Sequence, residues 1–331
     1  MVKDLVVEAA LVGAATFLAL LPWGNAVVRA LLKRGIGKQI RADEPEVHRA
    51  KSGTATMGGI YFLAGITLVT AILAAAKQPE GLAPLIAMLG YGLLGAFDDW
   101  RGLQDRGGVG WAARSKFPVQ WGTALILAVA AYPLMGHPRM LLPLNGLVID
   151  LGWWNVPILA FLIVAFSNAV NLTDGLDGLA GGTSAIAFLA FGTLAVAEGL
   201  GGLASFCAAT VGALGAFLWY NAHPAQMFMG DLGSQALGAG LAVVAVQSGH
   251  WLLLPVIGAI LLIEMLSVML QVGYFKYTHY KYGTGRRVFR MSPIHYHFEL
   301  GGWSEVQIVT RAWALAAATA AVGIVLGMGA G

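Results

Sequence analysis

The segment VPILAFLIVAFSNAVNLTDGLDGLAGGTSAIAFLAFGTLAVA, residues 156–197, consists of two long apolar runs joined by a short polar stretch. The runs at 156–172 and 179–197 approach the roughly 20 residues that a helix needs to cross a bilayer. The stretch between them carries Asp174 and Asp177. An unpaired charge beside a lipid-embedded helix is costly. The pattern therefore predicts two membrane helices with chemically important residues at their junction.

Composition extends this interpretation to the whole chain. Of 331 residues, 58% are hydrophobic and 11% are charged, whereas soluble domains have about a quarter charged residues. We therefore predict an all-α polytopic integral membrane protein, with a single integral-membrane domain over residues 1–331. Its partner is the lipid bilayer, and the net charge of +3 is not taken as a sign of nucleic-acid binding. Cys207 lies in an apolar run and is expected to be a buried packing residue.

Ten apolar runs are candidates for membrane spans, and counts of nine or eleven stay open. The first run has no basic leader and no small-residue cleavage site, so we expect it to be a retained span. The ten runs lie at about 5–32, 56–76, 82–97, 117–135, 156–172, 179–197, 202–220, 231–248, 252–276 and 306–328.

Basic residues predict the orientation of these spans. With ten spans, the odd-numbered loops and adjoining helix ends hold 17 of the 20 Lys and Arg residues, and only Lys3, Lys77 and Arg139 lie opposite. The positive-inside rule then makes the odd loops cytoplasmic and puts both termini on the periplasmic or extracellular side. On that outer side, Asn145-Gly146 between alternating apolar residues predicts a small hairpin within 136–155.

Acidic residues gather at the predicted cytoplasmic ends of the spans. A helix cap or an ion pair explains any one of them as well as a functional role does. Adjacent carboxylates in GAFDDW, however, repel each other unless a cation or a proton intervenes. Oxygen ligands beside glycines, without His/Cys spacing, favour Mg²⁺ or Mn²⁺. The acidic residues are Asp98, Asp99, Asp105, Asp174, Asp177, Asp231 and, deeper in a span, Glu264.

Two basic segments near these acids have the residue types that hold phosphates. HRAKSGTATMGG contains Lys51, Thr54 and Thr56 before a Gly-Gly pair, and RSKFP contains Arg114 and Lys116. A metal among acids with lysines nearby is the usual equipment for phosphoryl transfer. A solvated basic loop, or a contact with anionic lipid, is the alternative for the first segment.

The ninth loop, KYTHYKYGTGRRVFRMSPIHYHFELGGWSEVQ, is the longest. His295 and His297 would lie on one side of an extended segment but not on one face of a helix. Their spacing does not resemble a zinc site, so a structural or substrate-binding role is favoured. The loop's aromatic residues can stack on a base or sugar and its arginines can pair with anions. The alternative is a basic amphipathic loop on the lipid headgroups.

Five segments, in order along the chain, resemble one enzyme family. They are KSGTATMGG, GAFDDW, SNAVNLTDGLDGLAGG, FLWYNAHPAQMFMGDLGS and SPIHYHFELGGWSEVQIV, between about residues 48 and 312. Together they are similar to the phospho-N-acetylmuramoyl-pentapeptide-transferases, a branch of the polyprenyl-phosphate N-acetylhexosamine-1-phosphate transferases.

This resemblance implies a Mg²⁺-dependent membrane enzyme of peptidoglycan synthesis. Its substrates would be UDP-MurNAc-pentapeptide and undecaprenyl phosphate, and its products lipid I and UMP. The enzyme would lie in the bacterial plasma (inner) membrane as a multi-pass protein with its active site at the cytoplasmic face. A homodimer is left open.

The resemblance also implies roles for individual residues. The catalytic group would be Asp98, Asp99, Asp231 and Lys116, with Asp98 as base or as nucleophile and with Asp231 and Asp99 as metal ligands. The substrate-binding group would be Lys51, Thr56, Asn171, Asp174, Asp177, Asn221, Phe228, His295 and His297.

Two positions depart from the family pattern. Ala55 stands where proline is usual, and Tyr296 replaces the middle residue of a three-histidine run. A tyrosine can stack or donate one hydrogen bond but has no imidazole.

Two rival functions stay open at this point. A sister transferase would move GlcNAc-1-phosphate to the same lipid with the same metal chemistry. A cation-coupled transporter would also place acids in a helical bundle, but its carboxylates would lie near the midplane, where only Glu264 is expected.

Overall fold

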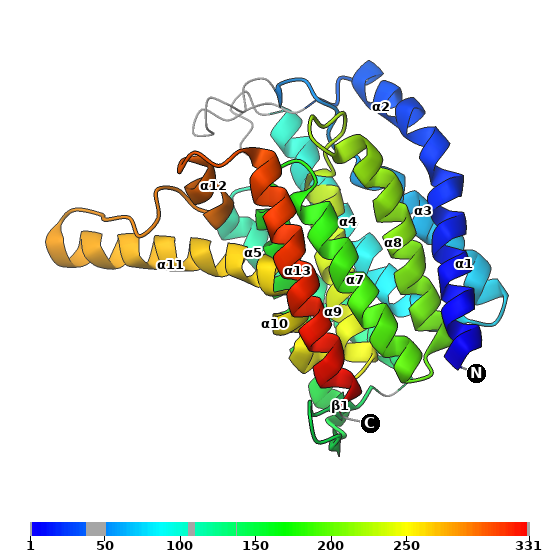
Figure 1. Cartoon of the computed structure of the whole chain (residues 1–331). Coiled ribbons are helices and arrows are strands. Elements are labelled where there is room, and N and C mark those ends of the chain that lie inside the picture. Colours follow the sequence, from blue (N-terminus) through cyan, green and yellow to red (C-terminus); the bar gives the residue numbers. More distant parts are fainter. Residues whose placement is uncertain (1, 38–50, 105–109, 137, 330–331) are drawn as a thin grey trace.

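The computed structural model describes residues 2–37, 51–104, 110–136 and 138–329, and these residues form a bundle of long helices (Figure 1). The long helices are α1 (Val2–Leu20), α2 (Gly24–Lys33), α3 (Gly59–Ala75), α4 (Leu82–Gln104), α5 (Ala113–Ala131), α6 (Asn155–Thr173), α7 (Leu179–Ala197), α8 (Gly201–Asn221), α9 (Gly230–Gln247), α11 (Ala259–Tyr282) and α13 (Glu305–Met328).

Short elements join these helices. They are the helices α10 (Leu254–Ile257) and α12 (Ile294–Glu299), five 3₁₀ turns, η1 (Leu21–Trp23), η3 (Pro79–Gly81), η4 (Tyr132–Met135), η5 (Gly152–Trp154) and η6 (Trp251–Leu253), and the strands β1 (Met140–Leu141) and β2 (Val148–Ile149). The strands pair antiparallel, with Met140 opposite Ile149. Gly146 has a positive φ of 63° between them, which confirms the hairpin predicted around Asn145-Gly146.

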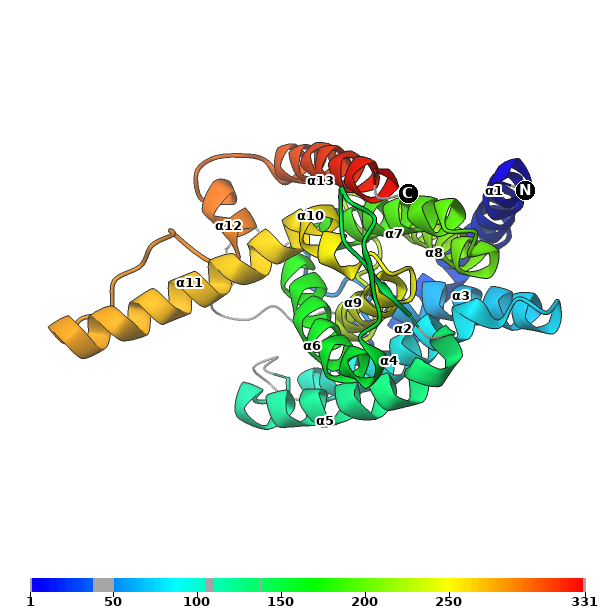
Figure 2. The same cartoon turned by 90° about the horizontal axis from the view of Figure 1, so that it is seen from below.

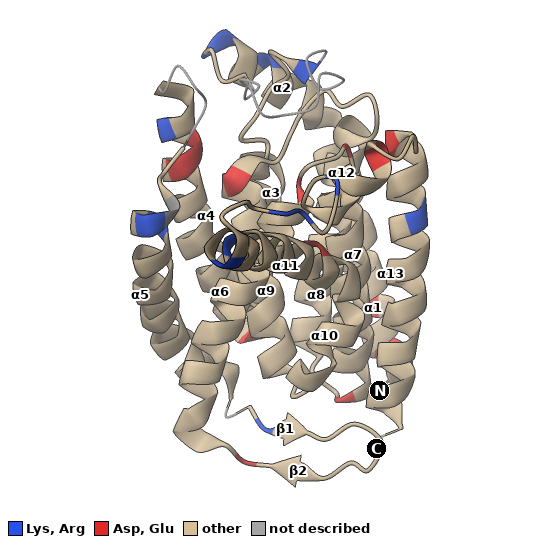
Figure 3. Cartoon of the chain, turned by 90° about the vertical axis from the view of Figure 1, so that its left-hand side faces the viewer, with Lys and Arg blue, Asp and Glu red and all other residues tan. Residues whose placement is uncertain are grey.

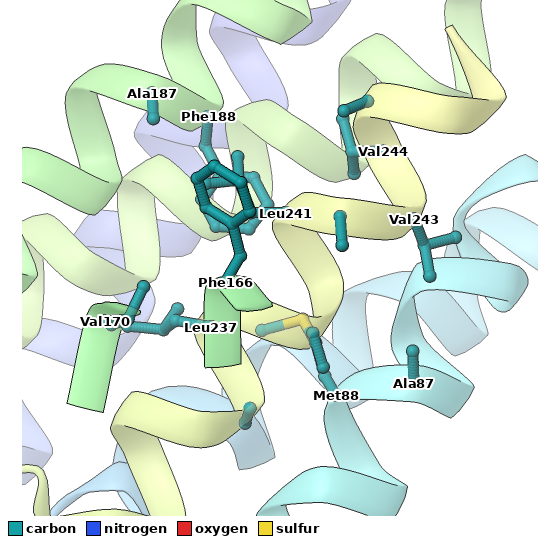
Figure 4. Close-up of a cluster of buried hydrophobic side chains, with 14 of the residues drawn as sticks. Ala87, Met88, Phe166, Val170, Ala187, Phe188, Leu237, Leu241, Val243 and Val244 are labelled. Carbon is teal, nitrogen blue, oxygen red and sulfur yellow. The ribbon is translucent and has the colours of Figure 1, made fainter. Parts of the chain in front are cut away.

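Helix α9 is the centre of the bundle. Every residue from Leu232 to Gln247 is buried, and α9 packs most extensively along α4 and α6. Figure 2 shows α9 surrounded by other helices. In Figure 4, Leu241 of α9 lies beside Phe166 of α6 and Phe188 of α7. The start of α9 is therefore held in a fixed place by the core.

Glycines let the backbones of these helices approach closely. A Cβ at Gly238 of α9 would lie 2.1 Å from the carbonyl oxygen of Phe166 in α6. A Cβ at Gly95 of α4 would lie 2.1 Å from the carbonyl oxygen of Asp231. Small residues at helix contacts are typical of membrane bundles, where packing replaces the hydrophobic driving force. The second contact brings the end of α4 against the start of α9.

All ten predicted spans coincide with helices, although the number of spans and their orientation stay predictions. Within the described ranges, eight segments are long and apolar enough to cross a membrane. The other two predicted spans are α3, which has only 17 residues, and α9, whose first turns are polar. The eight segments are Val2–Lys33, Pro79–Gln104, Arg114–Met135, Gly152–Thr173, Leu179–Ala197, Gly201–Asn221, Ala259–Tyr282 and Glu305–Met328.

The span predicted at 252–276 is divided in the structure. Helix α10 ends before Gly258, where a Cβ would lie 2.9 Å from the Phe166 ring. Helix α11 starts beyond this break and runs sideways out of the bundle (Figure 1). A uniform apolar run does not reveal such a break, because a single glycine is tolerated within a membrane helix. The break aims the first half of α11, including Glu264, at the bundle.

Both ends of the chain lie at the same end of the bundle, and the C-terminal end lies beside the hairpin (Figure 1). Charged residues gather toward the opposite end, around α2 and α12 (Figure 3). Cys207 is fully buried, as expected. Most charged side chains of the described residues therefore lie at the end of the bundle opposite the termini.

The contact between α6 and α9 makes a testable prediction. Gly238→Ala should destabilise the protein by about 1–3 kcal/mol, because the new methyl group overlaps the backbone of α6. Gly273→Ala is the matched control, since a Cβ at Gly273 meets no atom within 4 Å. Thermal unfolding of both variants in detergent measures the difference. Equal melting temperatures would show that the close approach is not needed.

Candidate active site

A cleft of about 600 Å³ opens where α4, α5, α6, α9 and α12 meet. Nine of the thirteen predicted site residues line it. They are Thr56, Asp98, Asp99, Lys116, Asn171, Asp174, Phe228, Asp231 and His295. The predicted catalytic group, which comes from three separate segments of the sequence, is thus brought together.

A lysine joins the two principal carboxylates of the cleft. Lys116 Nζ lies 2.7 Å from Asp231 Oδ2 and also donates to Asp98 Oδ2. Asp98 Oδ1 accepts the backbone N–H of Trp111. Like charges this close repel unless a cation lies between them. The ammonium group of Lys116 supplies that cation from the first turn of α5.

Amide side chains hold Asp231 from the other side. Asn171 Nδ2 donates to Asp231 Oδ1 at 2.8 Å, and Gln235 Nε2 donates to Asp231 Oδ2 at 3.0 Å. Gln120 Nε2 in turn donates to Gln235 Oε1 at 3.4 Å. Fixed donors of this kind lock the rotamer of a ligand side chain. The orientation of Asp231 is therefore set by α6 and α9 themselves.

Asp99 acts as a cap for α9. Its Oδ1 accepts the N–H of Asp231 and its Oδ2 accepts the N–H of Leu232, both at 3.0 Å. These are unpaired donors of the first helical turn, which attract negative charge. Gly230 has φ of 70°, and a Cβ there would lie 2.5 Å from Asp99 Oδ2. The structure thus gives Asp99 a positioning role beside its predicted role as a metal ligand.

The donor set of the cleft fits Mg²⁺. The described residues around Lys116 offer carboxylate and amide oxygens, which are the hard ligands that Mg²⁺ prefers. The ammonium group between Asp98 and Asp231 shows that this pair of carboxylates accommodates a cation. Of the three acids, Asp231 and Asp98 face each other across that position, so they are the better-placed pair.

A second charged cluster lies behind the cleft and contains two predicted substrate-binding residues. Lys51 Nζ lies 2.7 Å from Asp177 Oδ1 and 2.6 Å from Glu305 Oε1. His223 Nδ1 lies 2.9 Å from Asp177 Oδ2 and 3.2 Å from Glu305 Oε2. The three ligand atoms of Asp177, His223 and Glu305 lie within 4.8 Å of one another. Here too a lysine supplies the cation, and Lys51 and His223 together tie four loops and helix ends to one another.

Some of the other predicted binding residues line the cleft, and others hold the loops around it. Phe228 and Thr56 line the cleft, and Lys51 Nζ lies 5.9 Å from the centre of the Phe228 ring. Asn221 is buried and does not line the cleft. Its side chain accepts the N–H of Gly178 and donates to the carbonyl of Met227. Asn221 therefore holds the loop of Asp177 rather than facing a ligand.

The two histidines of the ninth loop separate, because the segment is the short helix α12 and not an extended strand. His295 is buried at the wall of the cleft. His297 points elsewhere, accepts the N–H of Arg290 at 3.1 Å and packs on Phe289. His297 therefore does not line the cleft, and its substrate-binding role stays a prediction. Tyr296 also lines the cleft.

Sequence reasoning missed several members of these clusters. His223 and Glu305 lie inside two of the quoted segments, and only their long-range contacts reveal their role. Gln235 lies one helical turn after Asp231, a spacing that places both on one face of α9. Asp105, predicted as part of the acidic group, lies outside the described residues.

Comparisons with known proteins point to one family. A family model described as glycosyl transferase family 4 matches residues 82–249. The protein named phospho-N-acetylmuramoyl-pentapeptide-transferase from Chloroflexus aurantiacus is 44% identical over 337 residues, covering 99% of this chain and 91% of its own length. Proteins of the same name from Desulforamulus reducens and Geobacillus kaustophilus are 45% identical, with coverage of 93% and 92%, and 46% identical, with coverage of 87% and 88%.

The second cluster makes a prediction about acid stability. Burial raises the pKa of Asp177, but the hydrogen bond and charge of Lys51 more than offset it, so this pKa lies below 3.8. The resulting stabilisation is complete above the unfolded-state pKa and is lost as the pH falls through the lower folded-state pKa. Lys51→Met should therefore move the onset of acid unfolding to a higher pH.

Circular dichroism during acid titration in detergent measures this onset. Lys281→Met is the control, because Lys281 is exposed and the contacts of its Nζ with described residues are to Tyr277 and Tyr282. The account of the cluster fails if Lys51→Met and Lys281→Met unfold at the same pH.

Proposed function

The chain belongs to the phospho-N-acetylmuramoyl-pentapeptide-transferase family, and we propose that it transfers phospho-N-acetylmuramoyl-pentapeptide from UDP to undecaprenyl phosphate. Membership of this family makes it a phosphoglycosyl transferase of peptidoglycan synthesis, and its apolar helices make it a multi-pass membrane protein. The products are lipid I and UMP. The proposed location is the bacterial plasma membrane, with the cleft on the cytoplasmic side.

The observation that carries the proposal is the bridge from Asp98 through Lys116 to Asp231 at the cleft. A diphosphate substrate needs cationic groups to balance its charge, and acids are needed to hold a metal beside it. Both lie together at one end of the bundle. A soluble nucleotide sugar and the headgroup of a lipid phosphate can meet only at such a membrane edge.

The reaction exchanges one phosphoanhydride bond for another. An oxygen of the lipid phosphate forms a bond to the sugar-bearing phosphorus of the nucleotide sugar. The bond from that phosphorus to the bridging oxygen breaks, and UMP leaves with the electron pair. Since a diphosphate is consumed and another is formed, ATP is not required.

The residues of the cleft have separate tasks in this exchange. Asp98 accepts the proton of the lipid phosphate, where it carries one, and Lys116 neutralises charge on the phosphates. Asp231 would hold Mg²⁺ on the side that faces Asp98, and the ion when bound would lower the negative charge that the attacking oxygen meets. Asp99 keeps the first turn of α9 in place. Phe228 offers a flat apolar face for the uracil base.

Two observations favour this reaction over its rivals. The relatives named above bear the name of the muramoyl-pentapeptide enzyme rather than that of the GlcNAc-1-phosphate enzyme. The deep acid Glu264, which a transporter would need for its ion, is paired with His295 at 3.0 Å.

Turnover by the purified chain tests the proposal directly. With undecaprenyl phosphate and Mg²⁺, UMP should be released from UDP-MurNAc-pentapeptide, and chelation of the metal should stop the release. Asp231→Asn should lower the rate by about 100-fold or more, because it removes a charged group that acts on the reacting phosphates.

Asp150→Asn, the same substitution in the hairpin at the far end, should turn over normally. Product from UDP-GlcNAc alone would assign the chain to the sister reaction. Normal turnover by Asp231→Asn would overturn the site.

A further inference from the structure

Glu264 is an acidic residue with an unusual environment. It lies within α11, is 4% exposed, and has its ion-pair contact with His295. Within the described ranges, no lysine or arginine forms a salt bridge with it. A buried carboxylate is costly in an apolar bundle. Its presence therefore calls for a specific task.

The geometry of the pair fixes the imidazole ring. Glu264 Oε2 lies 3.0 Å from His295 Nδ1 and 3.4 Å from the backbone N of the same residue. An ionised carboxylate can only accept hydrogen bonds, so the contact selects the form of His295 with a proton on Nδ1. The two ring nitrogens lie on opposite edges, and fixing Nδ1 therefore also fixes the direction of Nε2.

The other nitrogen lies at the cleft. His295 Nε2 is buried and has no hydrogen-bond partner among the described residues. It lies against Gly175, where a Cβ would be only 2.3 Å from it. Both residues line the cleft that holds Asp98 and Asp231. A buried polar atom without a partner is costly, and a substrate in the cleft can supply that partner.

We propose that Glu264 is a positioning residue that presents Nε2 of His295 to the phosphate-bearing part of the nucleotide sugar. This inference rests on the proposed function. In it, His295 contacts the substrate and Glu264 acts only through His295. A carboxylate that does not itself line the cleft thereby serves the site through His295.

Anchoring of the ninth loop does not explain Glu264. Gln271, also on α11, accepts the N–H groups of Val288 and Phe289 and donates to the carbonyl of Phe289. The loop is thus already tied to α11 by an uncharged side chain. A negative charge at residue 264 fixes which ring nitrogen of His295 carries the proton. An anchor for the loop would not need such a charge.

A double-mutant cycle on the full chain tests this inference. Glu264→Gln has the same shape but can also donate, so it no longer selects one form of the ring. We expect kcat/KM for UDP-MurNAc-pentapeptide to fall roughly 10- to 100-fold, with little change in melting temperature. In a His295→Gln background, Glu264→Gln should add less than about a twofold loss.

Glu198→Gln is the matched control, because Glu198 pairs with the buried His250 at 3.2 Å at the far end of the bundle. It should leave kcat/KM unchanged. Wild-type kcat/KM in Glu264→Gln, or losses that multiply in the double mutant, would overturn the positioning role. Absence of turnover by the wild-type chain would instead overturn the proposed function, and the inference with it.

A second variant covers the case in which Glu264→Gln does not fold. Gly175→Ala leaves Glu264 intact but places a methyl group on Nε2 of His295. It should lower kcat/KM while the imidazole is present and have no further effect in a His295→Ala background. Equal losses in both backgrounds would overturn the inference.

Discussion

The structure depends on the need to neutralise several carboxylates at one end of an apolar bundle. Asp98 and Asp231 are close enough to repel each other, and the ammonium group of Lys116 lies between them. Asp99 uses another source of positive charge, the N-terminal amides of α9. The Lys116 bridge and the cap formed by Asp99 each require the helices that carry these groups to lie in fixed positions. The packing of α4, α5 and α9 is therefore tied to the electrostatics of the cleft.

The same principle recurs behind and beside the cleft. Lys51 neutralises Asp177 and Glu305 and so joins the loop before α3, the α6–α7 junction and the start of α13. Glu264 pairs with His295 and so relates α11 to α12. In each case a charge that is costly in a bundle is satisfied by a residue far away in sequence. These pairs fix the loops around the cleft, which the apolar core alone would leave undirected.

Apolar run length was sufficient to predict the helices, because crossing a bilayer requires about 20 residues. The motifs also predicted that Asp98, Lys116 and Asp231 meet. The sequence did not predict the break at Gly258, the helical form of α12 or the cap formed by Asp99. These features depend on contacts between distant segments, and a local pattern such as two histidines two residues apart fits a strand or a helix equally well.

The central claim is that the carboxylates bridged by Lys116 form the cation and phosphate site. An experimental structure of the full chain with UMP and Mn²⁺, located by its anomalous signal, tests this claim directly. The account predicts an ion in contact with a carboxylate oxygen of Asp231, on the side of the cleft that faces Asp98. An ion held instead by Asp177, His223 and Glu305, with Asp231 bound only to protein donors, would contradict it.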